Sequence, residues 1–343
     1  MDSSVQRFAR SPQVRVWAWI ALSALLLYLA LRGVNLNDIW DTLSHADFRF
    51  IGLAIFSVAL NILFKVARWH VLVEPSKKGV GFGKLTMSLM TGQTLNWFLP
   101  ARVGDVSRAY VIGGLGPGRS FVLGTVGVEK VLDMFSYVLL FLIALLLVPL
   151  PSWLNNSGYI FAAITLTLIV GVIVLVSFPE WFLKLTERLM FWVPVSYRLK
   201  IISWLTKSLS SLEILSKGSG LFKVAFLSAI VWGTAIWTNH LTGLALGLEL
   251  PITAALVVLV VLQIGIILPG SPGRIGVFQY LCIIALAIFG IEQAVGFSYG
   301  VLLQAIVLIP ATLVSLFFFG FLGLGPKTIN ILEESKRNQI ENP

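Results

Sequence analysis

The charged residues with the clearest chemistry flank a helix-breaking Leu-Pro-Ala step in an otherwise apolar sequence. Arg102, Asp105 and Arg108 follow this step, and Gln93 and Asn96 precede it. A guanidinium group is a planar fork that matches the oxygen atoms of a phosphate group. These residues therefore predict a site for a phosphate-bearing ligand.

Three more charges lie within the next apolar stretch, over 121–149. Glu129 and Asp133 are four residues apart, so they share one face of a helix, and Lys130 lies beside them. Charges inside a membrane-spanning helix are costly and are usually paired or functional. We expect Asp105, Glu129 and Asp133 to position the arginines or to bind a cationic part of the ligand. A purely structural network of buried ion pairs is the alternative.

A second broken segment, over 251–290, repeats the order of residues in the first. Both segments place a Gln, then Leu-Pro, then Arg-Val-Gly or Arg-Ile-Gly. Two such segments of opposite orientation form an inverted repeat, whose ligand site lies near the middle of the membrane. Arg274 of the second segment therefore joins Arg102 and Arg108 as a candidate phosphate ligand.

The composition excludes a soluble protein. Of 343 residues, 57% are hydrophobic and 12% are charged, and the mean hydropathy is +0.90. A soluble domain carries about 25% charged residues. The net charge of +9 lies beside apolar stretches, so it indicates membrane topology and contact with anionic lipids at the cytoplasmic face, and we expect no nucleic-acid partner.

Six apolar stretches are long enough to cross a hydrocarbon core of ~30 Å. They are 14–31, 50–67, 121–149, 159–178, 221–244 and 297–322. The basic residues before the first stretch and after the second indicate cytoplasmic segments, and the uncharged loop 151–158 indicates the outer side. Lys65 and Arg68 fit the same pattern, as interfacial cations whose heads reach toward the headgroups.

The chain is expected inside before residue 85 and outside at 151–158, and the stretch 121–149 supplies one crossing. The segment 85–118 must therefore cross the membrane an even number of times. Its arms are too short for two full spans, which predicts a re-entrant hairpin. The segment 251–290 is predicted to be a second hairpin, although two ordinary spans would satisfy the same count. The segment 179–220 is basic and rich in Trp, Phe and Leu, and we expect amphipathic helices on the cytoplasmic surface of the membrane.

These patterns predict an all-α polytopic membrane protein with about six full transmembrane helices and two re-entrant helical hairpins in an inverted repeat. We expect residues 1–343 to form one integral membrane domain. Its first half covers 50–149 and its second half covers 221–322. Both termini are expected in the cytoplasm, and the location is the inner or plasma membrane.

Three motifs resemble those of the lysylphosphatidylglycerol synthase transmembrane-region family. They are Asn96-WFLPARVGDVSR-Ala109, Val128-EKVLD-Met134 and Pro269-GSPGRIGVFQ-Tyr280, and the resemblance covers roughly 50 to 320. The family is the flippase-like membrane domain that is fused to a synthase in the bacterial multiple peptide resistance factor and stands alone in other membrane proteins. The resemblance implies movement of a phospholipid or a polyprenyl-linked lipid between leaflets.

The same resemblance assigns the family's motif positions to Arg102, Asp105 and Arg108 in the hairpin tip. Its charged helix falls on Glu129, Lys130 and Asp133. Lys130 stands where the family usually has Arg, and Gln279 stands where many relatives have Glu, so both bear on the identity of the headgroup. We expect no attached synthase domain, and we expect another protein to make the lipid.

We expect a lipid transporter that has no catalytic residue, cofactor or metal. The chain lacks the metal and nucleophile motifs of enzymes, and three scattered histidines cannot form a metal cluster. The expected partners are the lipid substrate and anionic lipids, and a homo-oligomer is compatible with the sequence. Two alternatives stay open at this point: a secondary transporter of a small anion, and a membrane-embedded lipid-transferring enzyme.

Overall fold

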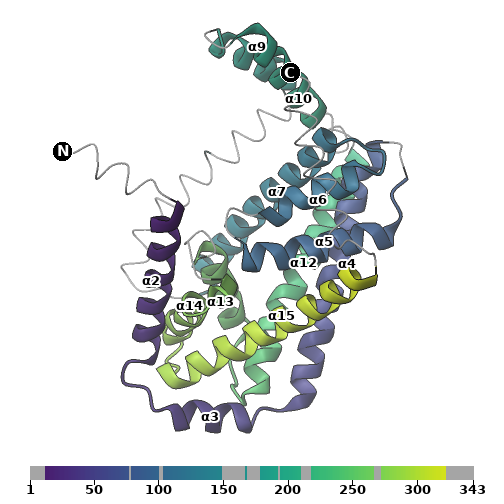
Figure 1. Ribbon diagram of the computed structural model, residues 1–343. Coiled ribbons are helices and arrows are strands. Elements are labelled where there is room, and N and C mark those ends of the chain that lie inside the picture. Colours follow the sequence, from purple (N-terminus) through teal and green to yellow (C-terminus); the bar gives the residue numbers. More distant parts are fainter. Residues whose placement is uncertain are drawn as a thin grey trace, which may run out of the picture.

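The computed structural model is all-helical in the part of the chain that it describes (Figure 1). The described residues are 12–76, 79–99, 103–148, 167, 178–191, 194–209, 218–265 and 272–321. Most of the predicted span over 159–178 lies outside these residues. Arg102, in the predicted tip of the first hairpin, also lies outside them.

Four long apolar helices confirm four of the predicted spans by length and composition. They are α4 (Phe48–Val73, continued by the short η1, Glu74–Ser76), α7 (Arg119–Leu147), α12 (Gly218–Ala245) and α15 (Gln293–Phe321). Each exposes large apolar side chains, such as Phe56, Leu146, Phe222 and Phe317, to its surroundings. Apolar side chains on the outer faces of long helices are expected where lipid replaces water, so the chain is a multi-pass membrane protein.

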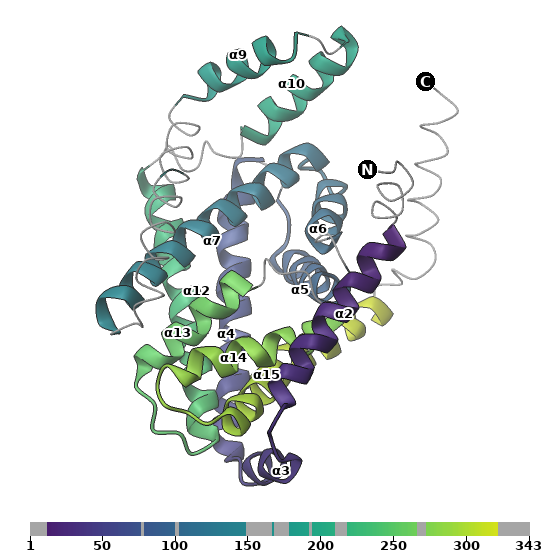
Figure 2. The same cartoon turned by 90° about the vertical axis from the view of Figure 1, so that its left-hand side faces the viewer.

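The first predicted span is also a helix, α2 (Pro12–Leu31), which packs against α14 and α15 (Figure 2). A short amphipathic helix, α3 (Leu36–Ser44), then leads the chain to α4. The side chain of Asn35 caps α3, and it accepts a hydrogen bond from the backbone N–H of Asn37 at 3.0 Å. This cap satisfies one of the unpaired N–H groups at the start of the helix.

Polar side chains join α4 to α12 along their shared face. Asn61 Nδ2 donates to the carbonyl of Val231 at 2.6 Å and to Thr234 Oγ1 at 2.9 Å. One turn away, Thr238 Oγ1 donates to Ser57 Oγ at 3.0 Å. Side-chain hydrogen bonds of this kind hold helices together where the apolar surroundings offer no hydrophobic driving force. They fix α4 and α12 as a pair.

Two short helices, α5 (Phe82–Phe98) and α6 (Val103–Gly113), occupy the first broken segment. At 1.5 Å per residue α6 is about 17 Å long, which is too short to cross the hydrocarbon core. The two helices touch at Gly92 and Gly104, and a Cβ atom on Gly104 would overlap the carbonyl oxygen of Gly92. Glycine at both positions is therefore what allows the backbones to pack this closely.

The second broken segment contains α13 (Ile252–Gly265), the single turn η4 (Pro272–Arg274) and α14 (Val277–Ala287). α14, with 11 residues, is also too short to span, being about 17 Å long. The backbone turns sharply between η4 and α14, where Gly273, Arg274 and Gly276 all have positive φ angles. Each predicted hairpin is thus two short helices around a break, while their placement in a membrane stays a prediction.

Two of the apolar clusters of the described chain lie beside these two segments, and α7 contributes to both. The first part of α7 packs with α4, α5 and α6 around residues such as Trp69, Leu89 and Ile112. The last part packs with α13, α14 and α15 around Phe141 and Leu286. α7 therefore packs against both broken segments.

Two further helices, α9 (Pro179–Leu189) and α10 (Val195–Leu209), lie at one end of the bundle (Figures 1 and 2). On α9, Trp181, Leu185 and Leu189 share one exposed face. α10 packs against α7. The placement of 179–220 on the cytoplasmic surface of the membrane stays a prediction.

Candidate functional site

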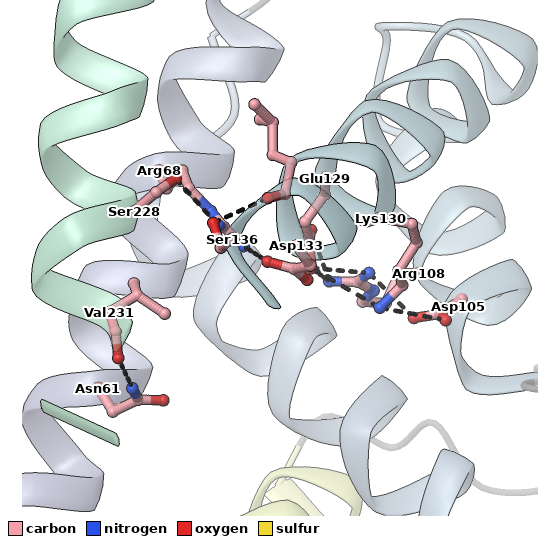
Figure 3. A network of polar contacts seen from close by, with 11 residues as sticks. Asn61, Arg68, Asp105, Arg108, Glu129, Lys130, Asp133, Ser136, Ser228 and Val231 are labelled. Carbon is pink, nitrogen blue, oxygen red and sulfur yellow. Dashed lines mark hydrogen bonds and ion pairs between the residues drawn. The ribbon is translucent and has the colours of Figure 1, made fainter. Parts of the chain in front are cut away.

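A set of paired charges lies between α4, α6 and α7, and we call it the ionic cluster (Figure 3). Its members are Arg68, Asp105, Arg108, Glu129, Lys130 and Asp133. Five of the six were predicted from the sequence to act together. The cluster lies close to the middle of α7, where Asp133 is the fifteenth of 29 residues.

Arg108 is the centre of one half of the cluster. Its Nη1 atom lies 3.2 Å from Glu129 Oε2, and its Nη2 atom lies 3.0 Å from Asp105 Oδ1. The guanidinium carbon is 4.9 Å from the centre of the Trp69 ring. Only 2% of Arg108 is exposed, so two carboxylates and an aromatic face enclose this charge. Such pairing offsets the cost of removing an ion from water.

Lys130 lies at the open edge of the same half. Its Nζ atom is 3.4 Å from Asp105 Oδ2 and 3.9 Å from Glu129 Oε1. The Lys130 side chain is 34% exposed and that of Asp105 is 13% exposed. Met134, one turn after Lys130 on α7, is an exposed apolar side chain, and so is Val106, which follows Asp105 on α6. The accessible edge of the cluster therefore has an apolar border.

Arg68 is the centre of the other half, and the sequence interpretation of this residue is wrong. Arg68 Nη2 donates to Asp133 Oδ1 at 2.8 Å, and Nη1 donates to Ser228 Oγ on α12 at 3.1 Å. The residue is 1% exposed, so its head does not reach toward the membrane surface. Asp133 supplies a partner inside the protein, and pairing there replaces hydration by headgroups and water.

A signal for Arg68 was present in the sequence. Ser57, Asn61 and Arg68 are separated by four and seven residues, which places them on one face of a helix. A polar stripe on a membrane-spanning helix faces protein rather than lipid. This spacing would have predicted Arg68 to be internal.

Asn96 and Gln93 lie on α5, beside the cluster's hairpin. The Oδ1 atom of Asn96 is buried next to Gly104 and accepts no hydrogen bond from the described residues. Gln93 is half-buried on the same helix. Of these two predicted site residues, Asn96 therefore brings an unused acceptor to the point where α5 and α6 touch.

Arg274, a predicted site residue of the second segment, contacts the end of the first hairpin. The guanidinium carbon of Arg274 is 5.6 Å from the ring centre of Trp97, at the end of α5, and Trp97 also contacts Phe278. The second turn therefore meets the first hairpin through these aromatic contacts. That Arg274 joins Arg102 and Arg108 at one phosphate site stays a prediction, since Arg102 lies outside the described residues.

Gln279 stabilises the second turn through two hydrogen bonds. Its Oε1 atom accepts a hydrogen bond from the backbone N–H of Gly276 at 2.7 Å, and its Nε2 atom donates to Gln304 Oε1 at 2.5 Å. Gln304 in turn donates to the carbonyl of Gly273. Gln304 was not predicted, because nothing in a stretch of apolar helix identifies a partner 25 residues away.

These features define a multi-pass helical membrane protein with a buried ionic cluster beside a pair of short, tightly packed helices. The sequence matches the family described as the lysylphosphatidylglycerol synthase TM region over residues 16–315. Because the match covers most of the chain, the protein belongs to this family, whose description indicates a lipid-related membrane function. Searches of curated proteins and of solved structures found no match.

Proposed function

We propose that the protein moves a phosphate-bearing phospholipid or polyprenyl-linked lipid between the two leaflets of a cell membrane. The observation that carries this proposal is the ionic cluster, which lies inside a bundle whose outer faces are apolar. Intramembrane ionisable residues generally mark a substrate or ion pathway. Membership of a lipid-related family favours a lipid as the substrate.

The border of the cluster supports a lipid over a free anion. In the proposed binding mode, the headgroup lies against Lys130 and Asp105, the two most exposed members of the cluster. Val106 and Met134 then offer apolar contact for the glycerol and upper acyl region. A small soluble anion would gain nothing from such a border, whereas a lipid keeps its tails in the bilayer throughout.

The short helix pairs are the elements that would change position during transport. In this proposal α5 and α6 form one re-entrant hairpin, and α13 and α14 form the other, with opposite orientations. Rocking one half against the other would expose the cluster to each leaflet in turn. The cycle contains no covalent step, and it runs down a lipid gradient or couples to protons or the membrane potential.

The experiment that tests this proposal is dithionite quenching of fluorescent phosphatidylglycerol in proteoliposomes. We expect faster loss of inner-leaflet fluorescence with the protein than in protein-free vesicles. Arg102→Ala and Asp105→Ala should slow this loss, whereas Glu249→Ala, at an exposed carboxylate between α12 and α13, should not. Vesicles that take up radiolabelled phosphate but flip no lipid would contradict the proposal and identify a small-anion transporter.

A further inference from the structure

The charges of the ionic cluster balance, and one neighbouring cation remains in excess. Arg68, Arg108 and Lys130 are matched by Asp105, Glu129 and Asp133. Lys65 lies on α4 three residues before Arg68 and four before Trp69, which places it on the same face of the helix. Lys65 therefore lies on the side of α4 that carries the Arg68–Asp133 ion pair.

Among the described residues, Lys65 makes no ion pair with a carboxylate. It is half-buried on a membrane-spanning helix. With Lys65 included, the seven side chains carry one positive charge more than negative. A half-buried cation without a counter-ion is costly in an apolar setting, and a bound anion would remove that cost.

The two arginines are poor candidates for direct contact with that anion. Both Nη atoms of Arg68 and both Nη atoms of Arg108 already donate to protein oxygens. Their Nε atoms are enclosed by protein, and the two residues are 1% and 2% exposed. A ligand could reach them only after breaking buried ion pairs, which is strongly unfavourable.

The two lysines have the opposite properties. Lys130 is 34% exposed and its contacts with carboxylates, 3.4 and 3.9 Å, are long. An ammonium group has three donors on a flexible stem, so it can bind an additional acceptor without losing the first. In the described part of the chain, no hydrogen bond or ion pair occupies the donors of Lys65.

We propose that Lys65 and Lys130 donate directly to the phosphate of the bound headgroup, and that Arg68 and Arg108 are positioning residues. The arginines hold the carboxylates of Asp133, Glu129 and Asp105 in place. These carboxylates in turn set the electrostatic potential at the point where the lysines bind the anion. This inference rests on the proposed function. It assigns to Lys65 a binding role that its sequence context, a cation near a helix end, did not predict.

The test is binding of short-chain dioctanoyl phosphatidylglycerol to the full-length protein purified in a neutral detergent. Dioctanoylglycerol, which lacks the phosphate, and inorganic phosphate are tested in parallel. We expect Lys65→Gln and Lys130→Gln each to weaken binding of the phospholipid about tenfold, the loss expected for a hydrogen bond to a charged group. Lys65→Arg should retain binding, because it keeps the charge and the donors.

Lys84→Gln is the matched control, since Lys84 is exposed at the start of α5 and makes no ion pair with a described residue. Thermal unfolding of each ligand-free variant separates loss of binding from loss of folding, and we expect Lys65→Gln to unfold at or above the wild-type temperature because it removes an unpaired cation. Wild-type affinity in both Lys65→Gln and Lys130→Gln would overturn the inference. So would weakened binding that is matched by equal weakening for dioctanoylglycerol.

The proposed function and this inference fail in different ways. If proteoliposomes flip phosphatidylglycerol but the lysine variants flip and bind it normally, the lysine roles are wrong and the proposed function stands. If the protein binds inorganic phosphate through Lys65 and ignores phosphatidylglycerol, the lysine site stands and lipid transport is wrong.

Discussion

Arg68 on α4 and Asp133 on α7 form an ion pair of 2.8 Å that is almost entirely enclosed by protein. Arg68 also donates to Ser228 on α12. One guanidinium group therefore holds three long helices together at the level of the ionic cluster. The position of Glu129, one turn before Asp133 on α7, depends on this contact.

Loss of one partner of this pair should be severe. We expect Arg68→Ala to lower the free energy of unfolding by about 3–5 kcal/mol, because it leaves the Asp133 carboxylate buried without a counter-ion. The combination of Arg68→Met with Asp133→Leu should recover most of the loss, since it removes both charges. Thermal unfolding in detergent measures both effects. Arg32→Ala, at an exposed arginine after α2, is the control, and equal unfolding temperatures for Arg68→Ala and wild type would contradict the prediction.

The contact between α5 and α6 should not tolerate a methyl group. In Gly104→Ala the new Cβ atom would overlap the Gly92 carbonyl oxygen, so we expect a loss of about 1–3 kcal/mol in stability. Lipid movement should slow as well, because Arg108 and Asp105 are on the displaced helix. In Gly127→Ala, on α7, the methyl group meets no atom within 4 Å, and this variant should be as stable as wild type or more so. Two variants of equal stability would show that the helices do not pack as described.

Trp69 should stabilise the site in two separable ways. Its Nε1 atom donates to Thr125 Oγ1 at 3.1 Å, and its ring lies beneath the Arg108 guanidinium. Trp69→Phe should lose the hydrogen bond, about 1 kcal/mol, whereas Trp69→Leu should also lose the cation–π contact, a further ~0.5–2 kcal/mol. Thr125→Val removes the same hydrogen bond from the other side. Its effect should therefore not add to that of Trp69→Phe in a double-mutant cycle, and full additivity would contradict the contact.

The second turn should depend on the pair Gln279 and Gln304. Replacing either residue with Leu leaves buried polar atoms without partners, so each variant should lose about 1–3 kcal/mol in the free energy of unfolding. The double variant should lose less than the sum of the two. If Gln279→Leu instead keeps wild-type stability and abolishes only lipid binding, Gln279 contacts the ligand and does not hold the turn.

The sequence predicted the long helices and the breaks because both signals are local. Hydropathy alone locates α4, α7, α12 and α15, and proline and glycine locate the two interruptions. The grouping of Asp105 and Arg108 with Glu129 was predictable for a further reason. Opposite charges in a small apolar volume have few other partners to choose.

The sequence could not assign partners that depend on how helices pack. Arg68 joins Asp133 because α4 and α7 lie side by side, and Gln304 joins Gln279 because α15 packs on α14. The roles of the arginines were hard to predict for the same reason. A guanidinium group can bind a phosphate or a carboxylate with the same geometry. Only the packing of the helices shows that Arg108 forms its ion pairs with carboxylates.

Photo-cross-linking of a headgroup-labelled phospholipid tests the central claim most directly, namely that a lipid headgroup reaches the ionic cluster. The protein is placed in nanodiscs with a phosphatidylglycerol analogue whose headgroup carries a diazirine, and labelled peptides are mapped by mass spectrometry. We predict adducts on the peptides of α4 and α7 that contain Lys65 and Lys130, and fewer of them in Lys130→Gln. Adducts confined to outward-facing segments, such as α3 and α9, would contradict the account.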